Sequence, residues 1–140
     1  MGYKEKSYIG ILVTTTIFYG WYFIGAFEKA RNGDTALADF GPTMWWMMGA
    51  YVVLIIIAMA TIGIWNNAQA DEPNDERDKL ISLKGEQVSN LIHGAGLFGL
   101  LVMVMSEASS FMIAHAILGT LVLGTILGFA VQIYLYRRGI

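Results

Sequence analysis

The sequence contains no cysteine and few charged residues. Of its 140 residues, 56% are hydrophobic and 14% are charged, and the mean hydropathy is +0.54. The absence of cysteine excludes disulfides, thiolate metal sites and cysteine nucleophiles. A water-soluble domain of this length would carry more charge, so the composition favours a single-domain membrane protein. The net charge of −2 gives no reason to expect a nucleic-acid partner.

Charged residues are missing from four long apolar runs. Each run reaches the ~20 residues that a helix needs to cross a ~30 Å hydrocarbon core. Lipid cannot satisfy free backbone groups, and the runs lack the alternation of barrel strands, so helices are expected. The sequence therefore predicts that residues 1–140 form one all-α, polytopic membrane domain with four transmembrane helices in two antiparallel hairpins. The expected helices span about 7–27, 43–65, 88–106 and 111–136.

The connection at 66–87 is long and charged, unlike the other two. Pro42 and Pro73, the only prolines, lie outside the apolar runs, and Pro73 precedes a cluster of acidic residues. Asp75 is placed to cap a helix there, and acidic residues in a first turn complement the helix dipole. We expect a short amphipathic helix at the membrane surface that bends near Gly85 into the third span. Leu80, Leu83, Gln87 and Leu91 fall on one face of it, opposite Lys79 and Glu86.

Lysine and arginine are distributed unequally between the two sides of such a protein. With four spans, both termini and the 66–87 linker share one side, which carries seven of the nine cations. Positive residues stay in the cytoplasm, so we expect this side to be cytoplasmic in a bacterial inner membrane. The seven cations are Lys4, Lys6, Arg77, Lys79, Lys84, Arg137 and Arg138, and the two on the other side are Lys29 and Arg31.

Two histidines lie within the apolar runs, where ionisable side chains are the first candidates for function. Histidines on adjacent helices are a pattern that binds haem through two axial ligands. His93 lies near the cytoplasmic end of its helix and His115 near the opposite end of the next, so their depths should differ by roughly 15–20 Å. That separation is too large for one iron. We assign no cofactor or metal, and separate sites completed by neighbouring subunits stay open.

Hydrogen bonding accounts for the polar residues inside the membrane. Gln132 is expected near the depth of His93, with Asn90 one turn closer to the cytoplasm, so His93 and Gln132 are placed to share an interhelical hydrogen bond. His115 lies near Glu107 and the outer surface, where partial hydration lets it respond to pH. The threonines of the first and fourth spans are expected to bond to their own helices.

Small residues recur at four-residue spacing in the last two spans. Thr120, Gly124 and Gly128 form a ridge on the fourth helix, and Ala95 and Gly99 form another on the third. Such ridges let helix backbones approach closely in lipid. The pattern leaves open whether these ridges pack the third helix on the fourth or one protomer on another.

The charged linker carries a resemblance to a known group of proteins. The stretch Asp75-Glu76-Arg77-Asp78-Lys79-Leu80-Ile81, then Lys84-Gly85-Glu86 and a transmembrane hairpin, resembles small predicted bacterial membrane proteins classed as a domain of unknown function. These proteins have two spans, a "DERD"-type segment, two further spans and a basic tail similar to 132–139. In the first half of the chain the resemblance is limited to the layout of the spans. The resemblance implies four helices. In such families a helix-turn-helix regulator is often encoded nearby, but the resemblance implies no activity.

No combination of residues in the sequence indicates catalysis. The carboxylates near 75–78 alternate with cations and are explained by a solvated helix start. We therefore expect a non-enzymatic protein that acts by association, as a homo-oligomer or as a small subunit of a larger membrane assembly. The expected cytoplasmic contact surface consists of Asp75, Glu76, Arg77, Asp78, Lys79 and Lys84.

Two other functions stay open at this stage. One is a small oligomeric transporter or channel with Glu28, Glu107 or His115 at its mouth. Transport generally needs a charged residue at mid-membrane depth, and the sequence has none there. The other is a redox accessory subunit that binds haem or quinone through His93 or His115.

Overall fold

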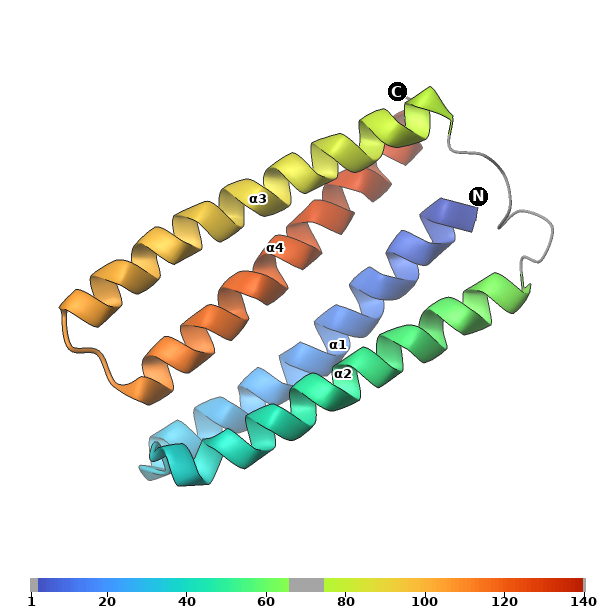
Figure 1. Cartoon of the computed structure of the whole chain (residues 1–140). Coiled ribbons are helices and arrows are strands. Elements are labelled where there is room, and N and C mark those ends of the chain that lie inside the picture. The colour runs from blue at the N-terminus through green and yellow to red at the C-terminus, as the bar shows by residue number, and fades with distance from the viewer. Residues whose placement is uncertain (1–2, 66–74, 140) are drawn as a thin grey trace.

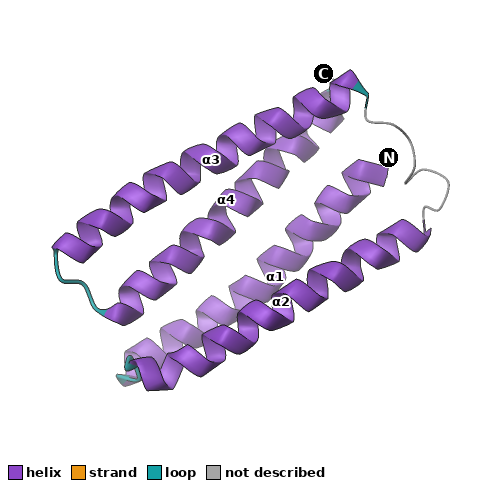
Figure 2. Ribbon diagram, viewed as in Figure 1, coloured by secondary structure: helices purple, strands orange, loops and turns teal. Residues whose placement is uncertain are grey.

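The computed structural model describes residues 3–65 and 75–139, with backbone only at 3, 4 and 65. All regular elements in these ranges are α-helices (Figures 1 and 2). They are α1 (Tyr3–Asn32), α2 (Leu37–Trp65), α3 (Glu76–Met105) and α4 (Ser110–Arg138). Each is long and apolar enough to cross a membrane, which confirms the all-α architecture with four candidate spans. Linker residues 66–74, including Pro73, and the side chain of Lys4 lie outside the described part.

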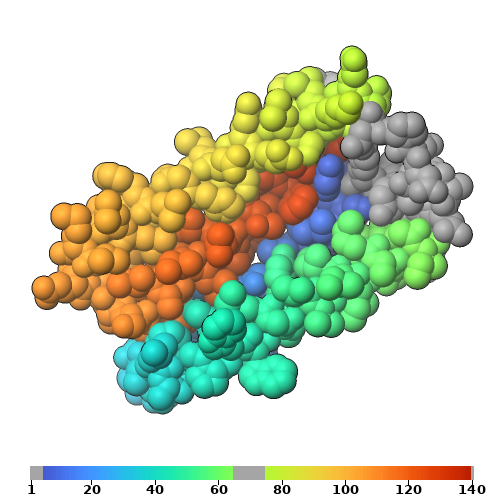
Figure 3. All heavy atoms as spheres, viewed as in Figure 1, coloured from blue at the N-terminus to red at the C-terminus, as the bar shows by residue number. Residues whose placement is uncertain are grey.

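The four helices are arranged openly. α4 lies between α3 and α1, and α2 packs against α1 (Figure 1). α2 touches α4 only slightly, and within the described ranges α3 packs closely against α4 alone. The space-filling view shows a furrow between α4 and α2 with α1 at its floor (Figure 3). We call the end with the two interhelical turns the turn end, and the end with both chain termini and the start of α3 the terminal end (Figure 1).

α2 begins earlier than the sequence predicts. The helix starts at Leu37, so Pro42, which was expected to precede it, lies inside it. Pro42 is the sixth residue of α2, and because proline lacks an N–H it cannot donate to the Ala38 carbonyl oxygen one turn earlier. The early start places Phe40, which is only 3% exposed, edge-on against the Phe111 ring of α4 at a centroid distance of 5.3 Å. This contact is where α2 reaches α4.

α3 runs unbroken from Glu76 to Met105. Asp75 caps it as expected, because its carboxylate accepts the Glu76 N–H at 2.7 Å. The expected bend at Gly85 is absent. Gly85 serves close packing instead, since a Cβ at this position would overlap the Gln132 side chain of α4. At ~1.5 Å per residue the helix is about 45 Å long, which exceeds the ~30 Å of a hydrocarbon core.

A four-residue turn joins α3 to α4. Glu107 adopts the left-handed conformation (φ 55°) and is exposed, which ends α3 and reverses the chain. Ser109 then caps α4, because its hydroxyl accepts the Met112 N–H at 3.3 Å. The turn aligns α3 and α4 so that residues equally distant from it along the chain face each other. This register determines which polar side chains meet.

Candidate functional site

The contact between α3 and α4 is a seam of small and polar residues. On α4 the residues of the predicted ridge lie in this seam: a Cβ at Gly124 would overlap the His93 ring, and one at Gly128 would lie 3.1 Å from the Gly85 carbonyl oxygen. Thr120 lies against Gly96 in the same way. The two helices are thus close enough that an added Cβ at each of these glycines would crowd the opposite helix.

His93 and Gln132 do not form the predicted hydrogen bond. His93 lies opposite Gly124 with its Nε2 buried and without a partner, and the buried Oε1 of Gln132 has none either. Gln132 instead lies beside Gly85, with its Nε2 3.5 Å from the Ser82 carbonyl oxygen. Its level is about 12 Å from that of His93, eight residues along α4. The two polar side chains therefore occupy separate places in the seam.

The predicted ridge of Ala95 and Gly99 on α3 does not take part in this seam. Both residues are exposed, and a Cβ at Gly99 would meet nothing within 4 Å. Gly96, one position away, faces α4 instead. Asn90 is also exposed, on the side of α3 that points away from α4. The outer face of α3 therefore carries polar and small residues that no other part of the described chain covers.

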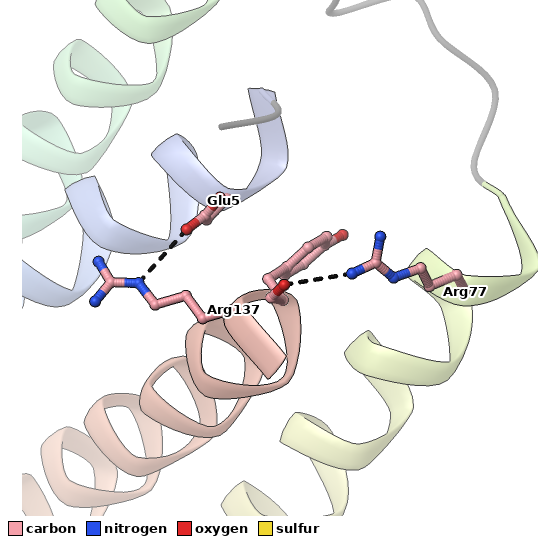
Figure 4. A network of polar contacts seen from close by, with 4 residues as sticks. Glu5, Arg77 and Arg137 are labelled. Atoms are coloured by element: carbon pink, nitrogen blue, oxygen red, sulfur yellow. Dashed lines mark hydrogen bonds and ion pairs between the residues drawn. The ribbon is translucent and has the colours of Figure 1, made fainter. Parts of the chain in front are cut away.

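Hydrogen bonds and an ion pair join three helices at the terminal end (Figure 4). The Tyr136 hydroxyl donates to the Asp78 carboxylate, and Arg77 donates to the Tyr136 carbonyl oxygen at 3.3 Å. Arg137 lies 3.6 Å from the carboxylate of Glu5 on α1. Two members of the expected contact surface, Arg77 and Asp78, are therefore engaged within the chain. The helix cap uses Asp75, while Glu76 and Lys79 are exposed and Lys84 is half-buried.

An aromatic cluster surrounds His115 at the turn end. The His115 ring stacks on Phe111 at a centroid distance of 4.0 Å and lies 5.4 Å from Phe40. Its Nε2 lies 3.0 Å from the Tyr22 hydroxyl of α1. The imidazole is thus partly buried among three helices, and its neighbours are aromatic rings rather than the expected Glu107.

The hydrogen bonds of His115 determine which nitrogen carries the proton in the neutral ring. Nδ1 lies 2.8 Å from the Phe111 carbonyl oxygen, and a carbonyl only accepts, so Nδ1 is the donor. Nε2 is then an acceptor, and the Tyr22 hydroxyl donates to it. The Tyr22 oxygen keeps free lone pairs with which to accept another hydrogen bond.

Two cavities are lined by residues of α1, α2 and α4. The larger, about 500 Å³, lies at the turn end and is lined by residues that include Tyr22, His115, Glu28 and Lys29. The smaller, about 230 Å³, lies farther along the same three helices and is lined by Thr15 and Tyr51 among others. Apolar cavities of some 300–1,000 Å³ with a few converging polar groups are typical of small-molecule sites. The larger cavity is therefore the candidate binding site.

Sequence reasoning missed the contacts between polar side chains of different helices, which include those of the terminal end. Tyr22 meets His115 in the turn-end cluster, and Thr15 meets the Tyr51 hydroxyl across α1 and α2 at 2.7 Å. Thr15 was expected to bond to its own helix, so that prediction is wrong for this residue, whereas Thr16 and Thr125 do so. A usable signal was the spacing of four and then three residues between Thr15, Tyr19 and Tyr22, which places them along one face of α1.

Comparisons with protein-family models, with curated proteins and with solved structures find no match for this chain.

Proposed function

We propose that this chain is a multi-pass inner-membrane protein that acts by association, with a second copy of itself bound through the outer face of α3. Its four helices lie in the membrane as two hairpins, and the terminal end faces the cytoplasm. The orientation is supported by the seven cations at that end against two at the other. No catalysis is part of the proposal.

A single observation carries the self-association: a heptad line on α3 that nothing in the described chain covers. The line alternates steps of four and three residues, which is the seam spacing of left-handed coiled coils. The apolar members are 51–67% exposed, and the polar and glycine members are exposed as well. Because α4 packs on the opposite side of α3, the whole line points outward. It consists of Leu83, Gln87, Asn90, Gly94, Leu97, Leu101 and Val104.

The polar members of this line favour a second copy over lipid. Asn90 lies about halfway along α3, and an unpaired amide in or near hydrocarbon is costly. An amide both donates and accepts, so two Asn90 side chains from parallel copies can satisfy each other at the dimer axis. Gly94, one turn further, has open space around it and lets the second helix approach closely. Copies with the same topology meet in parallel, as this pairing requires.

Cross-linking of single-cysteine variants tests the dimer. The natural chain has no cysteine, so Gly94→Cys introduces a unique thiol on the heptad line without a clash. We expect it to form disulfide-linked dimers on mild oxidation in native membranes. Val52→Cys, on the exposed face of α2, is the matched control and should stay monomeric. Equal cross-linking of both variants, or of neither, would contradict the proposal.

The dimer should also depend on Asn90. Asn90→Leu is expected to weaken self-association about 3–30-fold, because an interhelical hydrogen bond in a membrane contributes about 0.6–2 kcal/mol. Light scattering of purified protein in detergent, across a dilution series, measures the change. A wild-type mass that stays at one chain at every concentration would exclude self-association through α3.

A small oligomeric transporter is the second candidate, favoured by the turn-end cavity. Glu28 and His115, two of the three residues expected at a transport mouth, both line this cavity. The third, Glu107, lies on the α3–α4 turn outside the cavity lining. Solute flux in proteoliposomes that is lost in His115→Phe would support transport. Flux that persists in this variant would exclude a role for the cavity in transport.

A further inference from the structure

We infer that the turn-end cavity binds a lipid-soluble ring compound bearing hydroxyl groups, of the quinol class. The cavity lies on α1, α2 and α4, whereas the proposed dimer uses α3, so the two proposals are independent. Its volume of about 500 Å³ accommodates a substituted ring. The aromatic side chains of Trp21, Tyr22, Phe40 and Phe111 line it, and aromatic rings pack favourably in offset or edge-on contact with a flat ring.

The hydrogen-bonding groups of the cavity match a ligand that donates. Tyr22 gives its proton to His115 Nε2 and retains lone pairs, so its oxygen is an acceptor for a ligand hydroxyl. The carboxylate of Glu28, also in the lining, supplies a second acceptor. A quinol has two ring hydroxyls to donate. A quinone has only carbonyl acceptors, so Tyr22 could hold it only by giving up its bond to His115, and the one cationic donor of the lining, the Lys29 ammonium, already donates to the Asp39 carbonyl oxygen. The cavity should therefore prefer the quinol.

The charges of the cavity argue against a phospholipid headgroup. Lys29 is the one cation among the lining residues, and its ammonium donates to the Asp39 carbonyl oxygen at 3.4 Å. Phosphate recognition normally draws on several charge-assisted donors. Glu28 next to Lys29 offsets the remaining positive charge. A neutral ring with hydroxyl groups matches this lining better than an anionic headgroup.

The smaller cavity offers a place for the tail of such a compound. The smaller cavity of about 230 Å³ continues along the same three helices, about 10 Å from the larger one, seven residues along α1. An isoprenoid tail can thus extend from the turn end toward the middle of the molecule while the ring occupies the larger cavity.

Binding of decylubiquinol to the full-length protein in phosphatidylcholine nanodiscs tests the inference. The signal is the quenching of tryptophan fluorescence that is lost in Trp21→Phe. We expect saturable binding, tighter for decylubiquinol than for decylubiquinone, and no saturable binding of decanol, which has the tail without the ring. Tyr22→Phe should weaken quinol binding about tenfold, since it removes one hydrogen-bond acceptor.

Two glycine variants separate occupation of the cavity from general damage to α1. Gly25 lines the cavity and a Cβ there meets nothing within 4 Å, so Gly25→Leu places a side chain in the site and should abolish binding. Gly20→Leu, equally open but outside both cavity linings, should leave binding unchanged. Absence of saturable quinol binding, equal binding by Tyr22→Phe, or equal binding of decanol would overturn the inference. Loss of quinol binding when phosphatidylglycerol replaces phosphatidylcholine would assign the site to a phospholipid instead.

Discussion

At Gly124 the lack of a side chain leaves room for the His93 imidazole of α3. Gly124→Ala places a methyl group on the ring, and overpacking of this kind typically costs about 1–3 kcal/mol. We expect the free energy of unfolding to fall by that amount, measured by titrating sodium dodecyl sulfate into micelles and following circular dichroism. Gly99→Ala is the matched control, because its methyl group meets nothing within 4 Å and should cause no loss.

A second substitution shows whether the imidazole is the cause. His93→Ala combined with Gly124→Ala removes the overlapping ring, so the double variant should regain stability relative to the sum of the two single changes. Additive losses would mean that Gly124 is needed for another reason, such as a backbone contact. The small-residue ridge could be predicted from the sequence, but the partner of each glycine could not.

The sequence wrongly predicts that Gln132 lies at the depth of His93, and this error has a physical explanation. The predicted depth of His93 was counted from residue 88, where the uncharged run begins, whereas α3 begins at Glu76. The charged first turns extend the helix beyond the hydrophobic stretch, so counting from the stretch shifts the register of α3 against α4. Charge-free runs indicate which residues cross the membrane, but not where a helix starts.

The first turns of α3 are held by contacts at the terminal end. Its first turns are charged and are tied to α4 by the hydrogen bond from Tyr136 to Asp78. Tyr136→Phe removes that bond and keeps the ring beside Arg77. We expect about fivefold faster amide hydrogen exchange in residues 76–84, equivalent to the ~1 kcal/mol of a typical hydrogen bond.

The neighbouring tyrosine provides the control for this element. Tyr134 is 54% exposed, and its ring lies under Arg138 rather than against α3. Tyr134→Phe should leave exchange in α3 unchanged. Equal acceleration by both variants would show that the start of α3 is held by general packing and not by the Asp78 contact.

For the whole molecule, the sequence predicts the number and composition of the helices better than their arrangement. Hydropathy indicates four spans because hydrocarbon excludes charge over a fixed thickness. The open arrangement, with α3 packed on α4 alone, depends on interhelical contacts such as Phe40 with Phe111, which have no periodic signature. The turn-end cavity follows from that arrangement, so its lining could not be assembled from the sequence.

The proposed orientation of the molecule rests on the distribution of its cations and is testable with single thiols. Asp34→Cys and Glu107→Cys lie at exposed turn-end positions and should react with a membrane-impermeant maleimide added to intact cells. Lys79→Cys, exposed on the first turn of α3, should react only after the cells are permeabilised. The absence of natural cysteines makes each thiol unique.

Labelling of Lys79→Cys from outside would show that the orientation is the opposite of the proposed one. The consequences differ between the two proposed surfaces. The heptad line of α3 would still meet a parallel copy, since both copies would invert together. The quinol cavity would open in the cytoplasmic leaflet instead of the outer one, while its hydrogen-bonding groups would stay as they are. Orientation thus determines from which leaflet the ligand enters, whereas the interhelical contacts determine what the cavity and the α3 face can bind.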